Sequence, residues 1–164
     1  MGIVSFIKDA GEKLFGGSSA VAAAIAEPSS QEKLAAANEV ASKAIKTYIN
    51  AQGLPGDALT VSFNGADQLV TVSGAVASQE IREKIVVCCG NVQNVAGVID
   101  DMQAPEEPES TYHTVERGDT LSAISKKAYG NANLYNVIFE ANRPMLSHPD
   151  KIYPGQVLRI PPKP

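Results

Sequence analysis

Apolar residues change their spacing several times along the chain, and each spacing predicts a different element. After residue 30 they follow the 3.6-residue period of an α-helix. Ser29 or Ser30 precedes this stretch and can cap a first helical turn, and Gly53 follows it, where a left-handed conformation can end a helix. The pattern therefore predicts a long helix that begins at Gln31. Its inward stripe is Leu34, Ala37, Ala41, Ala44, Ile45, Tyr48 and Ile49.

Alternating apolar and polar positions follow this helix and predict a pair of strands. Leu59, Val61 and Phe63 alternate with polar residues, and a second alternating run covers residues 69–74. The sequence Asn64-Gly65-Ala66-Asp67 between them has the composition of a hairpin turn. We therefore expect an antiparallel hairpin.

A second helix and a last strand complete this block. Ser78 is a good N-cap, and apolar residues recur at helical spacing from Gln79 to about Cys89. Residues 95–102 then give a strand, so the block 32–103 has the order α-β-β-α-β. The inward residues of the helix would be Ile81, Ile85, Val86 and Cys89.

The C-terminal third, residues 112–162, has a different order of elements. Alternation at Tyr112 and Thr114 leads into a turn, after which Asp119 or Thr120 can cap a helix that ends at Tyr129-Gly130. The further elements are a helix at about 134–141, a type II turn at Pro154-Gly155 and a strand at 157–160. The predicted order is β-α-α-β.

Three segments connect these blocks. Residues 1–15 are expected to form a short N-terminal helix that docks on the first domain. Residues 16–31, rich in Gly, Ser and Ala, predict a flexible spacer, and residues 104–111 have the proline and glutamate content of an interdomain linker. The fold class is therefore α+β with two small domains. The apolar face of the N-terminal helix would be Ile3, Phe6, Ile7 and Ala10.

Composition narrows the classes of partner. The 164 residues carry a net charge of -4 and lack a basic cluster with interleaved aromatic residues, which argues against nucleic acid. No polybasic patch or long apolar run indicates a membrane partner. The short apolar run at residues 3–7 is broken by charges and does not fit a secretory signal. We expect a monomer in the cytoplasm.

The motifs of common enzymes are missing from the sequence, so we expect a protein that is not an enzyme. Cys88 and Cys89 are the only cysteines and are adjacent on a predicted helix. Two buried free thiols are the favoured interpretation, with a redox switch or metal site as the alternative. His113 and His148 lack companion ligands at metal spacing.

Two family resemblances rest on particular strings. YHTVERGDTLSAIS, KAYG, FEANRP and IYPGQVLRIP resemble the LysM family, and LVTVSGAV with GNVQNVAGVIDDM resembles the BON domain family. The LysM resemblance implies a glycan groove that binds N-acetylglucosamine, and hence an alternative function as a peptidoglycan-binding protein of the cell envelope. The groove residues it implies are Gly118, Asp119 and Thr120 opposite Pro149, Asp150, Lys151 and Ile152.

Two helix ends suggest a different chemistry. The end of a helix leaves about four carbonyl groups without partners and carries a partial negative charge. The predicted N-terminal helix and the helix that ends near Gly90 both offer such carbonyls. If the two ends converge, their oxygens could replace the water around a weakly hydrated ion such as K+, whereas Mg2+ would recruit carboxylates.

The whole chain, apart from about residues 16–30, resembles the bacterial cytoplasmic potassium-binding proteins of BON–LysM architecture. The strings that carry this likeness are MGIVSFIKDAGEKLF, YGNANLYN, IFEANRPML and PDKIYPGQVLRIP. The resemblance implies a K+ sensor or buffer in which the ion compacts the two domains. It implies that the ligands are the backbone carbonyls of Ile7, Ala10, Glu12, Gly90, Val92 and Val95.

A third interpretation makes both domains pure interaction modules. Aromatic side chains of the C-terminal block would then form a binding surface, although packing in a small core is the favoured explanation for most of them. These residues are Tyr129, Tyr135, Phe139 and Tyr153.

Overall fold

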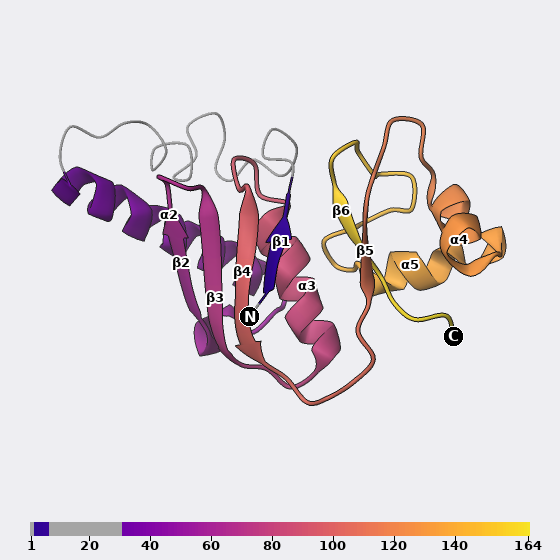
Figure 1. The fold of residues 1–164 in the computed structure, drawn as a ribbon, viewed down its shortest axis with the longest axis horizontal. Coiled ribbons are helices and arrows are strands. Elements are labelled where there is room, and N and C mark those ends of the chain that lie inside the picture. The colour runs from indigo at the N-terminus through magenta and orange to yellow at the C-terminus, as the bar shows by residue number, and fades with distance from the viewer. Residues whose placement is uncertain (1, 7–30) are drawn as a thin grey trace.

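The computed structural model describes residues 2–6 and 31–164, which form two domains with separate apolar cores (Figure 1). The predicted α+β fold with two small domains is confirmed. The N-terminal domain contains β1 (Gly2–Ser5), α2 (Gln31–Ala51), β2 (Thr60–Asn64), β3 (Leu69–Ala75), α3 (Gln79–Gly90) and β4 (Gly97–Gln103). The C-terminal domain contains β5 (Thr111–Thr114), α4 (Leu121–Tyr129), α5 (Tyr135–Ala141) and β6 (Val157–Ile160). Short 3-10 helices lie at Gly56–Ala58 and Ala132–Leu134.

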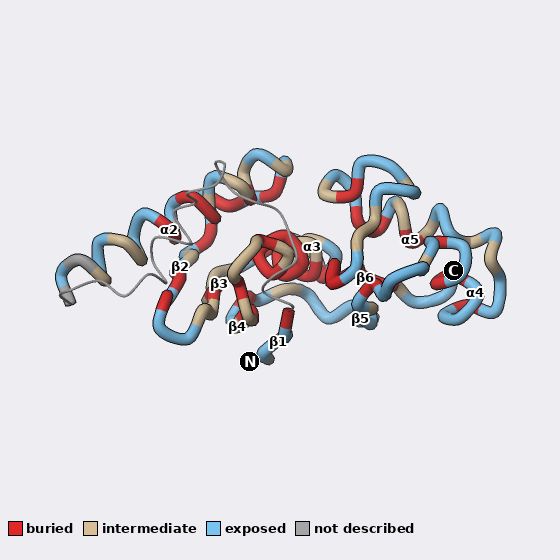
Figure 2. Tube along the Cα trace, turned by 90° about the horizontal axis from the view of Figure 1, so that it is seen from above, coloured by how far each residue is buried: buried red, intermediate tan, exposed pale blue. Residues whose placement is uncertain are grey.

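Four strands form the sheet of the N-terminal domain, in the order β1-β4-β3-β2. β2 and β3 make the predicted antiparallel hairpin, whereas β3 and β4 are parallel and are connected through α3. A parallel pair needs such a crossover because the chain must return to the same end of the sheet. α2 and α3 pack on one face of this sheet, and the buried residues gather between the two layers (Figure 2).

Both helices predicted for this domain are confirmed. α2 begins at Gln31, and the middle of its predicted stripe is buried. α3 begins where expected, because the Ser78 hydroxyl oxygen accepts a hydrogen bond from the Ile81 N–H at 3.2 Å. Its last half is buried almost all round, since the sheet covers one side and the C-terminal domain another (Figures 1 and 2).

The N-terminal helix predicted for residues 1–15 is wrong for Gly2–Ser5, which form the strand β1. This strand pairs antiparallel with β4, with Ile3 opposite Ile99 and Val4 opposite Val98. β-Branched residues such as Ile3 and Val4 suit a pleated strand, and β4 offers them an otherwise unpaired edge. Residues 7–15 of the predicted helix and residues 16–30 of the predicted spacer lie outside the described residues.

The C-terminal domain has the predicted β-α-α-β order around a two-stranded sheet. Of the two candidate caps, Thr120 is the one used, because its hydroxyl accepts the Ala123 N–H at 3.1 Å. Gly130 ends α4 with a φ of 74°, the left-handed conformation expected there. The core of this domain is Val115, Leu121, Ile124, Tyr129, Ile138, Leu146, Leu158 and Ile160.

The two domains meet along α3. The Glu83 carboxylate lies 3.5 Å from Nε of Arg159 in β6, and both side chains are buried. The same carboxylate accepts the backbone N–H of Ser110. The buried Val157 side chain, also from β6, packs within the core of the N-terminal domain. The interface is therefore continuous with that core.

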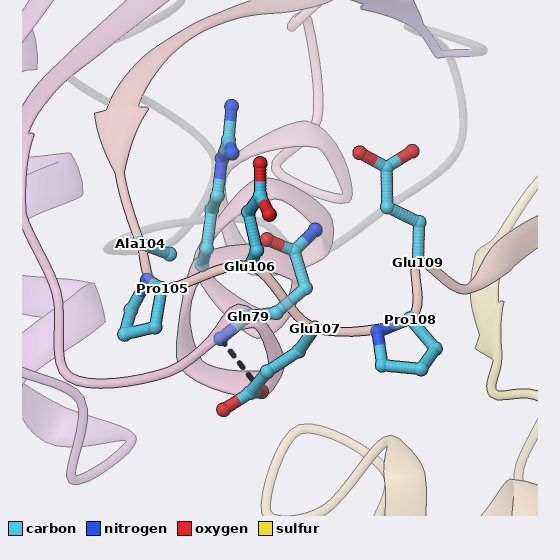
Figure 3. Close-up of a pocket in the computed structure, with 8 residues that line it drawn as sticks. Gln79, Ala104, Pro105, Glu106, Glu107, Pro108 and Glu109 are labelled. Atoms are coloured by element: carbon cyan, nitrogen blue, oxygen red, sulfur yellow. Dashed lines mark hydrogen bonds between the residues drawn. The ribbon is translucent and has the colours of Figure 1, made fainter.

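The linker between the domains lies across the beginning of α3. Figure 3 shows residues Ala104–Glu109 around Gln79, whose backbone N–H donates to the Glu107 carboxylate at 3.3 Å. A carboxylate at this position satisfies a free amide and complements the positive end of the helix. Among the described residues, no helix combines the length and apolar character needed to cross a membrane.

Candidate functional site

Residues Gly90–Ala96, called here the α3–β4 loop, contain three of the six predicted carbonyl ligands. α3 continues into this loop through hydrogen bonds from the Asn91 N–H to the Val87 carbonyl and from the Val92 N–H to the Cys89 carbonyl. Asn94 then adopts a φ of 75°, a left-handed conformation that asparagine tolerates better than most residues. The loop therefore turns at Asn94, just beyond the end of α3 that carries a partial negative charge.

Phe6 joins the N-terminal segment to this loop. Its ring packs directly on Gly90, where any Cβ atom would overlap the ring. Its backbone N–H donates to the Ala96 carbonyl at 2.9 Å. The two contacts fix Phe6 at both ends of the loop, beside Gly90 and one residue after Val95.

The predicted ligand set is only partly described. Gly90, Val92 and Val95 lie in the α3–β4 loop. The Val92 carbonyl accepts the Val95 N–H at 3.2 Å, and a carbonyl oxygen carries two lone pairs. Within the described part of the chain, no hydrogen bond ends on the Gly90 or Val95 carbonyl oxygen. The remaining predicted ligands, Ile7, Ala10 and Glu12, lie outside the described residues.

Gln68, which sequence reasoning missed, also holds the loop. The side-chain amide of Gln68 donates to the Asn94 carbonyl at 3.0 Å, and the backbone carbonyl of Gln68 accepts the Ala96 N–H at 2.9 Å. Gln68 has a φ of 59° at the end of the β2–β3 turn. A positive φ is uncommon for a residue other than glycine. It marks Gln68 in the structure, but the sequence alone does not show it.

Cys88 and Cys89 occupy the last turn of α3, directly before the loop. Both are buried and unpaired, which confirms the interpretation as free thiols. Burial raises the pKa of the Cys88 thiol to about 12 and raises the pKa of Cys89 well above its ordinary value. Both thiols therefore stay neutral and fill the core at the base of the loop.

The residues predicted for a glycan groove are only partly brought together. Thr120, Pro149 and Asp150 line one hollow of about 440 Å³ in the C-terminal domain. Lys151 is exposed, whereas Ile152 is half-buried against the core of this domain. The other residues that line the hollow are Leu121, Ser122, Tyr135 and His148.

Gly118 and Asp119 serve the turn before α4. Gly118 has a φ of 90°, and the Asp119 carboxylate accepts the Glu116 N–H at 2.9 Å. The same oxygen lies 2.9 Å from Nε2 of His113. The Glu116 N–H, and then His113, hold the pKa of Asp119 below its usual value. These contacts fix the turn that ends in the cap Thr120.

The four aromatic residues considered as a binding surface differ in how far they are buried. Tyr129 is buried, and its hydroxyl donates to the Pro161 carbonyl at 2.6 Å, so it belongs to the core. Phe139 and Tyr153 are half-buried. Tyr135 is 39 % exposed and is the one of these four that lines the hollow.

Comparison with known proteins agrees with this architecture. Residues 35–105 match the BON domain family, and residues 113–161 match the LysM domain family. The protein named "Potassium binding protein Kbp" from Escherichia coli is 48% identical over 162 residues, which cover 98% of this chain and 99% of that protein. The chain belongs to the Kbp family.

Two further relatives of this Kbp family member match only in part. An uncharacterized protein of Deinococcus radiodurans is 45% identical over 34% of this chain and 21% of its own length. The protein named Esterase MT1326 from Mycobacterium tuberculosis is 45% identical over 32% of this chain and 11% of its own length. The BON match begins at residue 35 and the LysM match at residue 113, so β1 and Phe6 belong to neither, whereas the likeness to Kbp covers nearly the whole chain.

Proposed function

We propose that this member of the Kbp family binds K+ through backbone carbonyl oxygens, where its N-terminal segment meets the α3–β4 loop. The observation that carries the proposal is the position of Phe6, packed on Gly90 and hydrogen-bonded to Ala96. The name of the Escherichia coli relative, which is similar along nearly its whole length, supports the same ion. The proposed ligands are the carbonyls of Ile7, Ala10, Glu12, Gly90, Val92 and Val95.

The chemistry of the loop suits a large monovalent cation. Neutral carbonyl oxygens can replace the hydration shell of K+, which is weakly held. The end of α3 contributes partial negative charge without an ionised side chain. A divalent ion such as Mg2+ would instead prefer carboxylates and retained water. Because the ligands are main-chain atoms, the side chains at Val92 and Val95 are free to fill the core, and both are buried.

A role follows from the site's position beside the domain interface. We propose a cytoplasmic K+ sensor or buffer, not an enzyme, in which the ion stabilises the docked arrangement of the two domains. The two unpaired thiols support a reducing compartment. A ligand that binds only the folded form raises its stability by about 2.7 kcal/mol at a hundred times its dissociation constant.

Matched titrations with KCl and NaCl at constant ionic strength test the proposal. We expect a calorimetric binding isotherm and a rise in melting temperature in K+ that Na+ does not reproduce. Phe6→Ala should weaken both responses, because it removes the contact that brings the N-terminal segment to Gly90. Asn64→Ala, on an exposed turn of the same domain, is the control. Equal responses to both salts would exclude a selective site.

The hollow in the C-terminal domain favours a second candidate function. We propose, as the alternative, that Thr120, Pro149, Asp150 and Tyr135 bind a glycan that contains N-acetylglucosamine. A partly exposed tyrosine beside polar groups suits the alternating apolar and hydroxyl faces of a sugar ring. Retention on purified peptidoglycan sacculi, reduced by Tyr135→Ala, would support it. No retention at moderate salt would exclude it.

A further inference from the structure

The side chain of Asn91 makes two hydrogen bonds to a single residue of the other domain. Its Nδ2 donates to the Val157 carbonyl at 2.8 Å, and its Oδ1 accepts the Val157 N–H at 2.9 Å. Both amide atoms and both backbone groups are therefore paired, and this fixes the orientation of the amide. Residues 91 and 157 belong to different domains, so the contact connects the α3–β4 loop to β6.

The two hydrogen bonds from Asn91 pair with the backbone of β6 as a neighbouring strand would. Among the described residues, β5 is the one strand that pairs with β6, so the other edge of β6 has no neighbouring strand there. Asn142 caps Arg159 on this edge in the same way, since its Nδ2 donates to the Arg159 carbonyl at 2.9 Å and its Oδ1 accepts the Arg159 N–H at 2.8 Å. Two asparagines thus close the edge of β6, one from each domain.

Packing strengthens the contact on the β6 side. The Val157 side chain is 2% exposed and lies in the core cluster of the N-terminal domain. The backbone of Val157 would lose both partners if the domains separated, and its side chain would lose apolar burial at the same time. Asn91 and Val157 therefore form or break their contact together with the domain interface.

Asn91 also lies within the proposed ion site. Asn91 stands between Gly90 and Val92, two of the proposed ligands. Its backbone N–H, which donates to Val87, belongs to the same peptide group as the Gly90 carbonyl. Its backbone and side chain are thus held by three hydrogen bonds. A rotation of Asn91 would turn the Gly90 carbonyl directly, and it would displace the Val92 carbonyl through the Val92 N–H, which lies in the following peptide group.

We propose that Asn91 is a positioning residue for the ion site, which links the orientation of the Gly90 and Val92 carbonyls to the docking of β6. The inference rests on the proposed K+ function. Ion binding and domain docking then favour the same conformation of Asn91, and each strengthens the other by the same factor. Asn91 contributes no ligand through its side chain.

The test uses the full-length protein and two substitutions, Asn91→Ala and Asn91→Asp. The aspartate keeps the size of the side chain but places an oxygen opposite the Val157 carbonyl, in place of the N–H donor. Asn64→Ala is the matched control, because Asn64 is exposed at the end of β2 and its side chain bonds Ala66 and Asp67 in the adjoining turn. Calorimetry gives the K+ affinity, and hydrogen exchange gives protection in peptides that cover residues 91–96 and 155–160.

In the wild type we expect K+, compared with Na+, to increase protection of both peptides. Both Asn91 variants should bind K+ at least about fivefold more weakly. At saturating K+ they should regain protection of residues 91–96 but not of residues 155–160. A residue that only supports the fold would lower protection in both salts equally.

The outcomes separate the inference from the function on which it rests. If the wild type distinguishes K+ from Na+ while the Asn91 variants match Asn64→Ala in affinity and in protection at 155–160, the inference is wrong and the proposed function stands. If the wild type shows no difference between the salts, the proposed function fails and the inference falls with it. A K+-dependent change at 155–160 that is lost only in the Asn91 variants supports both.

Discussion

Asp119 shows how one side chain can stabilise a turn at one pH and not at another. Its carboxylate accepts the Glu116 N–H and lies within hydrogen-bond distance of His113, and these contacts hold its pKa below the usual value. A group with a lowered folded pKa stabilises the native state above its unfolded pKa, about 3.9 for aspartate. The contribution is lost as the pH falls through the folded pKa.

Asp119→Asn should therefore destabilise the C-terminal domain by about 1 kcal/mol at neutral pH, with a much smaller difference in acid. Thermal melts of both proteins, from pH 7 down to below the ordinary aspartate range, would measure this. Asp150→Asn is a control, because Asp150 is exposed and 3.8 Å from its histidine neighbour. A difference that stays constant across the series would contradict the assigned cause.

For single residues, the sequence predicted which side chains suit a cap or a turn, but not the groups to which they bond. Either Asp119 or Thr120 could cap α4 from the pattern alone. The structure gives the cap to Thr120 and uses Asp119 to close the preceding turn. The role of Asn91 had no local signal, because its partner Val157 is 66 positions away and contributes only backbone atoms.

At the scale of elements, α3 organises both the fold and the candidate site. Its first amide groups face the linker carboxylate of Glu107, and its last turn leads into the α3–β4 loop. β1 reaches this last turn through Phe6, which packs on Gly90. The contact requires a residue without a side chain at position 90, since a Cβ there would overlap the ring.

Gly90→Ala should displace Phe6 and leave the rest of the N-terminal domain folded, because the overlap involves the far end of a movable ring. We expect a loss of about 1–3 kcal/mol in unfolding free energy and a weaker response to K+. Urea unfolding in KCl and NaCl would measure both effects.

The double variant Phe6→Ala/Gly90→Ala supplies the control. Once the ring is absent, the added methyl group of Gly90→Ala should cost much less than it does in the wild type. Additive effects of the two substitutions would show that they act at independent places and would contradict the contact.

α3 and α4 were predictable because each has its own cap and its own periodic stripe, as Ser78 and Gly130 illustrate. β1 was not, because a short apolar run fits a strand or a helix equally well. Its conformation is decided by β4, a partner that lies far along the sequence. The set of carbonyl ligands stays a prediction that rests on family resemblance, whereas the support of the α3–β4 loop by Gln68 and Phe6 depends on tertiary contacts.

At the scale of the whole molecule, the two domains share a buried ion pair. Glu83 in α3 and Arg159 in β6 are 3% and 7% exposed, and the Ser110 N–H of the linker donates to the same carboxylate. Burying two charges is costly, so such a pair contributes to specificity of docking more surely than to net stability. Removing one partner leaves the other charge buried without compensation.

Glu83→Gln should therefore lower the unfolding free energy by about 3 kcal/mol or more, whereas the double variant Glu83→Leu/Arg159→Leu should lose less than the sum of its single substitutions. Denaturant unfolding of the full chain would measure these values. Glu80→Gln is a control on the same helix, since Glu80 is exposed and its pair with Lys84 should contribute less than about 1 kcal/mol. Similar losses at Glu80 and Glu83 would contradict a buried, coupled pair.

The pairing of β1 with β4 also sets an order in time. Gly2 pairs with Asp100, so during synthesis β1 must wait for almost the whole N-terminal domain before its partner strand exists. β2, β3 and β4 are joined by a hairpin and one crossover, which close shorter loops and lose less chain entropy. The three-stranded sheet is thus expected to form first and β1 to dock last. A newly made chain would then pass through a folded stage at which it cannot yet respond to the ion.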